Sequence, residues 1–152
     1  MHAVAKSVLL LGVLLAFVPG FAAAAAPTTQ TSDAGPYTIT LNQTSVDMKV
    51  MPLVTLTVRK DGKLADDLLP YGGSSGLADF INTRTGVTYN GYINPLGTSV
   101  SSVAPTNGKP TSAGPEMEIS MPNIPAGNYT LKAHIRGAGG KVYTASLMLD
   151  VR

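Results

Sequence analysis

Apolar and polar residues alternate in short runs along most of the chain after residue 36. The run 37–41 reads Tyr-Thr-Ile-Thr-Leu, and the run 54–59 reads Val-Thr-Leu-Thr-Val-Arg. Because successive side chains of a strand point to opposite faces, each run has one apolar and one polar face. The same pattern predicts strands at 37–41, 54–59, 77–83, 87–93, 116–121, 129–136 and 143–151.

Turn residues separate these runs. Asp61-Gly62 directly follows the second run and predicts a hairpin, because Gly takes a positive φ without steric cost. Turns are also expected at 84–86, 123–127 and 137–140, and the Gly-, Pro-, Ser- and Thr-rich stretch 94–115 predicts a long surface loop. No stretch of the chain after its first residues keeps a helical period over three turns.

About seven short strands with frequent turns are typical of an antiparallel sandwich. We therefore predict an all-β fold, an immunoglobulin-like antiparallel β-sandwich, with a barrel of similar strand count as the alternative. Gly127-Asn128-Tyr129 at the start of a late strand is typical of a tyrosine corner and favours the sandwich. The alternation requires buried side chains at Leu56, Val58, Leu131, Ile135, Leu147 and Leu149, and exposed ones at Thr57, Lys132 and Arg136.

The first residues have the pattern of a cleavable signal peptide. Lys6 precedes an apolar run at 7–18, and Ala22 and Ala24 have the small-x-small spacing of a cleavage site. We predict a signal peptide at 1–24, a flexible N-terminal arm at 25–36 and the β-sandwich domain at 37–152. The alternative is a permanent anchor helix, but the apolar run is shorter than the roughly 20 residues that cross a bilayer. The expected location is therefore periplasmic or secreted, with no membrane span in the mature chain.

Composition bounds the classes of partner. After the leader about 125 residues remain, enough for one domain with its own core, and the chain has no Cys. Acidic and basic residues nearly balance and are scattered along the chain. We therefore expect neither a nucleic-acid partner nor an anionic membrane surface, and a protein partner in the periplasm or extracellular space is the expectation.

Residues that could carry catalysis are few. His2 lies in the leader, so His134 is the only histidine of the predicted domain. No Ser lies in a Gly-x-Ser-x-Gly turn, and Glu116 and Glu118 fall on the polar face of their predicted strand. We therefore predict no catalytic residues and no enzyme activity.

Methionine is the remaining candidate metal ligand, because thioether sulfur suits Cu(I). Met117 and Met121 lie four apart on one predicted strand and His134 lies on the following one, so these three would be the ligands of a copper site. Alternation, however, places His134 on a polar face and the two thioethers on an apolar face. We therefore expect an ordinary exposed histidine, packed methionines and no cofactor. Met48-Lys49-Val50-Met51 is the one other close pair of methionines.

Several short motifs resemble one family. Residues 61–64 and 67–72, then 93–95, 124–131 and 140–144, resemble the exported YtkA-like domains, and the likeness covers most of 61–151. The resemblance implies a small immunoglobulin-like module of the kind found beside copper-handling and respiratory proteins. Three family histidines are replaced here by Leu77, Tyr92 and Asn94, so the family's histidine site is absent. Tyr92 and Asn94 could still hydrogen-bond a partner, and they are our predicted partner-binding residues.

Three functions remain open from the sequence. The first is an exported, non-catalytic binding or accessory module. The second is a periplasmic copper-binding protein that uses Met and His ligands. The third is a structural subunit in which the arm 25–36 adds a strand to the sheet edge of a neighbour.

Overall fold

The structure, a computed structural model, describes residues 29–71, 73–96 and 114–152. The predicted signal peptide, its cleavage site, the first residues of the arm and most of the predicted long loop lie outside these residues. Among the described residues the chain is built from strands with two short 3-10 helices, which confirms the all-β prediction. No helix in this part of the chain is long and apolar enough to span a bilayer.

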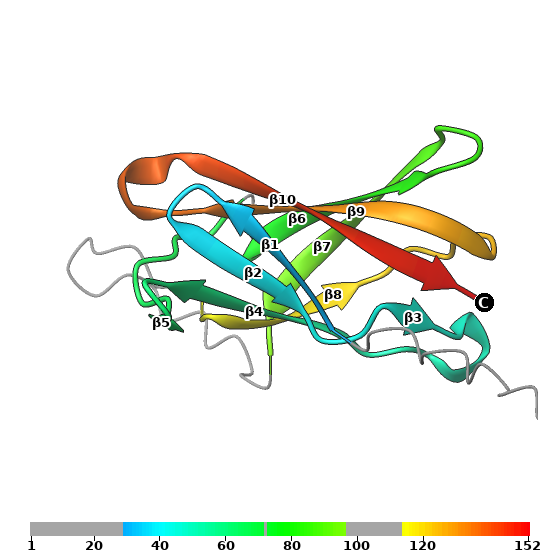
Figure 1. Ribbon diagram of the computed structural model, residues 1–152, viewed down its shortest axis with the longest axis horizontal. Helices are drawn as coiled ribbons and strands as arrows, with labels where there is room; N and C mark the ends of the chain where they lie inside the picture. The colour runs from blue at the N-terminus through cyan, green and yellow to red at the C-terminus, as the bar shows by residue number, and fades with distance from the viewer. Residues whose placement is uncertain (1–28, 72, 97–113) are drawn as a thin grey trace, which may run out of the picture.

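Ten strands and two 3-10 helices, η1 and η2, follow one another along the described chain (Figure 1). They are β1 (Gln30–Ala34), β2 (Tyr37–Leu41), β3 (Ser45–Val46), η1 (Met48–Val50), β4 (Val54–Lys60), β5 (Lys63–Leu64), β6 (Gly76–Asn82), β7 (Thr88–Pro95), β8 (Glu116–Ser120), β9 (Gly127–Arg136), η2 (Ala138–Gly140) and β10 (Val142–Val151). The seven runs with period-two alternation all form strands. The short β3 and β5 and the strand β1 are additional.

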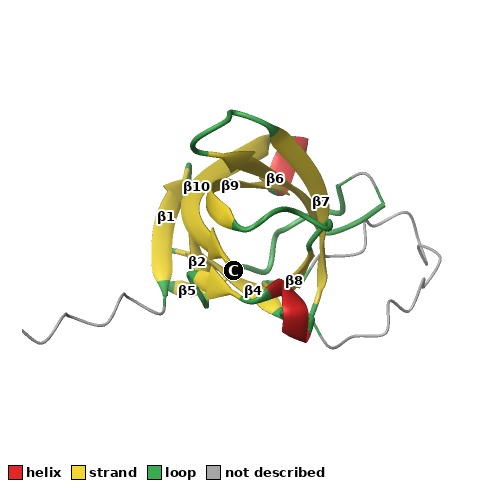
Figure 2. Cartoon of the chain, turned by 90° about the vertical axis from the view of Figure 1, so that its right-hand side faces the viewer, coloured by secondary structure: helices red, strands yellow, loops and turns green. Residues whose placement is uncertain are grey.

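All of these strands belong to one sheet with the order β1-β2-β4-β8-β7-β6-β9-β10-β3, and β5 pairs with the last two residues of β4. Neighbours are antiparallel except β3 and β10, which are parallel. The sheet curls around a central core, as the view along the molecule shows (Figure 2). Because β7 pairs with both β6 and β8, it joins strands that a sandwich would keep in two layers, so the predicted division into two separate sheets is not seen in the pairing.

The core lies inside this curled sheet and follows the predicted alternation. The six apolar side chains named from the pattern are buried, and Phe80, Ile93 and Tyr129 join them from β6, β7 and β9. Of the three predicted outer residues, Arg136 is exposed, whereas Thr57 and Lys132 are half-buried under their neighbours on the outer face.

The predicted tyrosine corner is present. Tyr129 is fully buried, and its hydroxyl donates a hydrogen bond of 2.7 Å to the carbonyl oxygen of Pro125. This contact fixes how the loop before β9 enters the sheet, because the phenol needs a partner when it is buried.

The predicted flexible arm is wrong for residues 30–36, which form β1 and its turn. β1 pairs with β2 along its whole length, and Gly35, with φ 63°, and Pro36 connect the two strands. This is the two-residue turn with Gly first that suits the twist of a hairpin. β1 was missed because its inward positions carry Gln30 and Ser32 rather than apolar residues, so it lacks the period that marks a strand.

β1 also lies beside the last long strand. The side-chain carbonyl of Gln30 accepts a hydrogen bond from the backbone N–H of Met148 in β10. In this structure residues 30–34 of the predicted arm extend the sheet of their own chain, whereas the strand-addition hypothesis places the arm on the sheet edge of a neighbour.

Candidate functional site

The predicted copper ligands do not meet. β8 pairs with β4 and β7, whereas β9 pairs with β6 and β10, so Met117 and His134 are not on neighbouring strands as the sequence suggested. Met117 is fully buried in the core, and His134 lies on the outer face of β9. Met121 follows the end of β8 and is half-buried. β8 and β9 follow each other in the sequence but do not pair, because β7 and β6 lie between them in the sheet.

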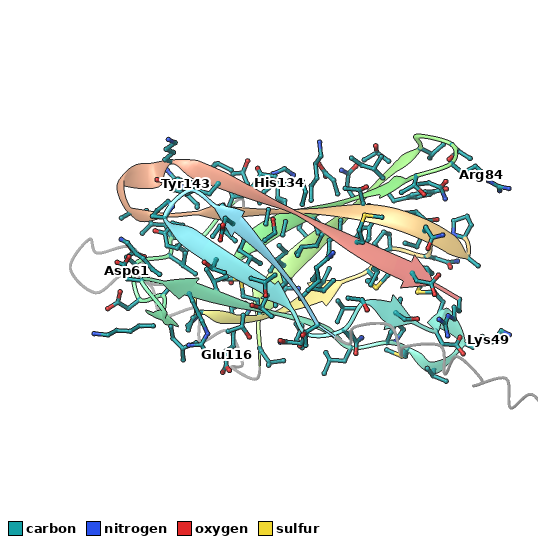
Figure 3. The ribbon with its side chains drawn as sticks, viewed as in Figure 1. Lys49, Asp61, Arg84, Glu116, His134 and Tyr143 are labelled. Atoms are coloured by element: carbon teal, nitrogen blue, oxygen red, sulfur yellow. The ribbon has the colours of Figure 1, made fainter. Side chains whose placement is uncertain are left out.

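His134, which is labelled in Figure 3, belongs instead to a chain of hydrogen bonds across the outer face of four strands. Its Nε2 lies 3.0 Å from Oδ2 of Asp79 on β6, and its Nδ1 lies 2.8 Å from Oγ1 of Thr144 on β10. Asn90 on β7 donates to the other oxygen of Asp79 at 2.7 Å. The ring is therefore less open than the exposed histidine we expected, with 22% of its side chain accessible.

A hydroxyl, an imidazole and a carboxylate in contact are also the parts of a general-base-activated nucleophile. Here Asp79 is held by Asn90 as well as by His134, and Thr144 lies directly opposite His134 in the β9–β10 pair. The four side chains thus satisfy one another as rungs on the surface of a sheet. Cross-strand pairs of this kind contribute to sheet stability.

The predicted partner-binding residues share one face. Tyr92 and Asn94 both project from the outer face of β7, and the Tyr92 side chain is 59% exposed. The amide of Asn94 donates a hydrogen bond of 2.8 Å to Oγ of Ser120 on β8, the residue opposite Tyr92 in the register.

A pocket that the sequence analysis did not predict begins next to Ser120. It has a volume of about 360 Å³ and lies between the end of β8 and the segment that carries η1. We call residues 48–53 the methionine loop and this hollow the methionine pocket. Its lining is Met48, Met51, Pro52, Leu53, Glu118, Ile119, Ser120 and Met121.

Hydrogen bonds hold the methionine loop at both ends. Asp47 caps η1 by accepting from the N–H of Lys49 at 2.9 Å, and the N–H of Met48 donates to the carbonyl of Arg152, the last residue. At the other end the side-chain amide of Gln43 donates to the carbonyl of Leu53 at 2.7 Å. η1 lies at the end of the molecule that carries the C-terminus and beside β8 (Figures 1 and 2).

Met51 has an unusual backbone conformation. It ends η1 in the left-handed region, with φ 53° and ψ 72°, which few residues other than Gly, Asn and Asp adopt. Its side chain is 94% exposed. Backbone strain of this kind clusters at functional sites, so the conformation and the exposed thioether together mark this position.

The methionine loop also exposes other apolar side chains. Val50 is 71% and Leu53 58% exposed, on either side of Met51. Lys49 adds one positive charge and is labelled at this end of the molecule in Figure 3. The signal in the sequence was the pair of methionines three residues apart. Met121 joins that pair only through the pairing of β4 with β8.

At the opposite end of the molecule, a polar cluster ties the segment after β5 to the sheet. Asp67 accepts from Lys60 Nζ and, at 3.0 Å, from the hydroxyl of Tyr37. The hydrogen bond from Lys60 lowers the pKa of Asp67 below its usual value, although partial burial opposes the shift. Burial is the main cause that raises the pKa of Tyr37.

No group of three or more His, Cys, Asp and Glu side chains that could hold a metal ion occurs in the ranges that the structure describes. Comparison of the chain with family models, curated proteins and solved structures gave no match.

Proposed function

We propose that this chain is an exported, non-catalytic binding module that docks a partner protein through the methionine loop. The observation that carries the proposal is the exposure of three neighbouring apolar side chains on an anchored loop, with Val50, Met51 and Leu53 between 58% and 94% accessible. A soluble domain places isolated apolar residues on its surface, but neighbouring ones beside a pocket are typical of an interaction site.

The chemistry of this surface favours a partner with an apolar projecting side chain. Methionines adapt their shape to different groups, as promiscuous protein-binding surfaces use them. Ser120 connects the pocket to Asn94 and Tyr92, which would supply a polar and aromatic rim. Because the loop is tied to Gln43 and Arg152, little ordering entropy would be lost on binding.

The signal-peptide pattern at 1–24 and the resemblance to YtkA-like domains support the same proposal. A cleaved leader would release the module into the periplasm or outside the cell, and the resemblance implies an accessory domain. The non-catalytic part of the proposal is supported by the small number of candidate nucleophiles and general bases, since His134 is the only histidine that follows the predicted leader.

The proposal is tested by placing a photoreactive amino acid at position 51 in cells that produce the chain. We expect one discrete crosslinked protein, identified by mass spectrometry. The product should be lost when Leu53→Asp puts a charge on the docking surface. A probe at position 64 is the matched control, because Leu64 is 47% exposed and lies on β5 at the other end of the molecule (Figure 1). Equal products from both positions, or none from position 51, would refute docking through this loop.

A further inference from the structure

The methionine pocket has a second property besides its apolar rim, because it gathers sulfur. Three of its lining residues, Met48, Met51 and Met121, carry thioethers, and they come from two segments that are far apart in the sequence. We infer that the Sδ atoms of these three residues bind one soft monovalent metal ion, Cu(I).

The donor set decides the class of ion. Thioether sulfur is a soft ligand that binds Cu(I), whereas hard ions such as Mg²⁺ and Ca²⁺ need several oxygens and Zn²⁺ prefers thiolate, imidazole or carboxylate. In the pocket lining, Glu118 and Ser120 are the residues with side-chain oxygens. Thioethers therefore supply three of the five side chains in the lining that could bind a metal ion.

The other methionines of the described chain show what the two ordinary roles of this side chain look like. Met117 is fully buried in the core and fills space. Met148 is 45% exposed on β10, and its sulfur accepts a hydrogen bond of 3.8 Å from the hydroxyl of Thr130. Met51, Met48 and Met121 differ from both because they share one pocket.

The pocket also lets the sulfurs converge. A methionine side chain has three rotatable bonds, and a volume of about 360 Å³ leaves room for the three chains to turn inward around one ion. The backbone, by contrast, is held in place by the Asp47 cap and by the bond from Met48 to Arg152. A fixed loop whose ligand side chains can rotate suits an ion that enters the pocket from solvent.

This inference goes beyond the proposed docking function, because the ion would bind the isolated chain without any partner. The two functions also separate by substitution. Met121→Leu keeps an apolar side chain of similar volume but removes one sulfur, so it should weaken metal binding and preserve the product crosslinked from position 51. Leu53→Asp, which removes docking, leaves all three sulfurs in place.

The test is a titration of the purified chain with Ag(I), a redox-inert substitute for Cu(I), followed by Cu(I) in competition with a chromogenic chelator under ascorbate. We expect one ion per chain. The methionine methyl resonances of residues 48, 51 and 121 should shift in NMR spectra, while those of residues 117 and 148 stay. Met51→Leu and Met121→Leu should each weaken binding about tenfold or more, the scale on which altered ligand surroundings change metal affinity.

Met148→Leu and His134→Gln are the matched controls, and both should bind like the parent chain. Thermal unfolding of the leucine variants should give midpoints close to that of the parent chain, which separates lost binding from lost structure. Absence of binding to the parent chain overturns the inference. So does binding that survives both Met51→Leu and Met121→Leu, or methyl shifts confined to Met148. A normal crosslink at position 51 in any of these cases leaves the docking proposal standing.

Discussion

Single residues of this protein are constrained most tightly where two backbones approach each other. Gly76 begins β6, and a Cβ at this position would overlap the carbonyl oxygen of His134 on β9 and press against Ile93 on β7. The neighbouring Ser75 is buried and its N–H donates to the carbonyl of Ile93. Ser75 and Gly76, at the end of the Gly- and Ser-rich stretch, are therefore small because they pack closely against neighbouring strands.

Gly76→Ala should destabilise the fold by about 1–3 kcal/mol, the usual effect of overpacking a well-filled interior. The backbone of β9 must move to admit the methyl group, and it is held by pairing on both sides. Urea unfolding followed by far-UV circular dichroism measures the change. Gly114→Ala is the control, because only ordinary van der Waals contact awaits a Cβ there, and it should stay within about 0.5 kcal/mol of the parent. Equal midpoints for the two variants would contradict the predicted overlap.

Among the elements, the segment after β5 depends on electrostatics for its position. Lys60 at the end of β4 and Tyr37 at the start of β2 both hold Asp67, while Ala65 and Leu68 beside it are buried. The hydrogen bond that Lys60 donates to Asp67 is the main cause that raises the pKa of Lys60. The same contact lowers the pKa of Asp67. The contact therefore favours both charged forms in the folded state.

The sign of the pH dependence follows from these directions. Because the folded pKa of Asp67 is below its unfolded value of about 3.8, its contribution to stability is present above that pH and is lost as the pH falls through the folded pKa. The folded pKa of Lys60 is above 10.5, so its contribution is complete below that pH and is lost in stronger alkali.

Asp67→Asn should therefore lower the free energy of unfolding at neutral pH. Below about pH 4, the free energy of unfolding of this variant should fall less steeply than that of the parent chain. The measurement is the free energy of unfolding in urea across this range. Asp66→Asn is the control, because the Asp66 side chain is exposed, and it should keep the dependence of the parent chain. If the free energy of unfolding fell equally steeply in acid for Asp67→Asn and for the parent chain, the Asp67 contact would make no contribution to stability.

Taken whole, the molecule has one core enclosed by one curled sheet. The inward residues of β2, β4, β6, β7, β8, β9 and β10 form a single buried cluster. The sheet nearly returns to its start, since Gln30 of β1 bonds to the backbone of β10. Loss of packing at any point in this core should weaken the entire domain, with no separate layer left folded.

Leu131→Ala tests this organisation. Leu131 is fully buried on β9, so its truncation should destabilise the domain by about 2–5 kcal/mol while unfolding stays a single transition. Tyrosine fluorescence and circular dichroism should report the same midpoint. Leu64→Ala, at a position 47% exposed on β5, should change stability by well under half of that amount. Two separate transitions in Leu131→Ala would mean that the sheet folds as independent parts.

Local chemistry was enough to predict the seven alternating strands, the faces of their side chains and two turns. Asp61 and Gly62 both have positive φ, as the hairpin reading requires, and Tyr129 makes its corner. These features depend on residues within a few positions of one another, because strand geometry and turn conformation are local properties. Alternation with period two was sufficient to predict that Leu56, Val58 and Leu131 point into the core.

Pairing between distant strands supplied what the pattern could not. Alternation with period two assigns a side chain to a face but says nothing about which strand lies beside it. The pattern therefore could not predict that His134 contacts Asp79 rather than Met117. β1 is a strand because β2 offers it an edge, although its own residues lack the apolar period. Met121 reaches the methionine loop through the pairing of β8 with β4. Each outcome depends on contacts between segments far apart in the chain, and such contacts exist only once the sheet has closed around its core.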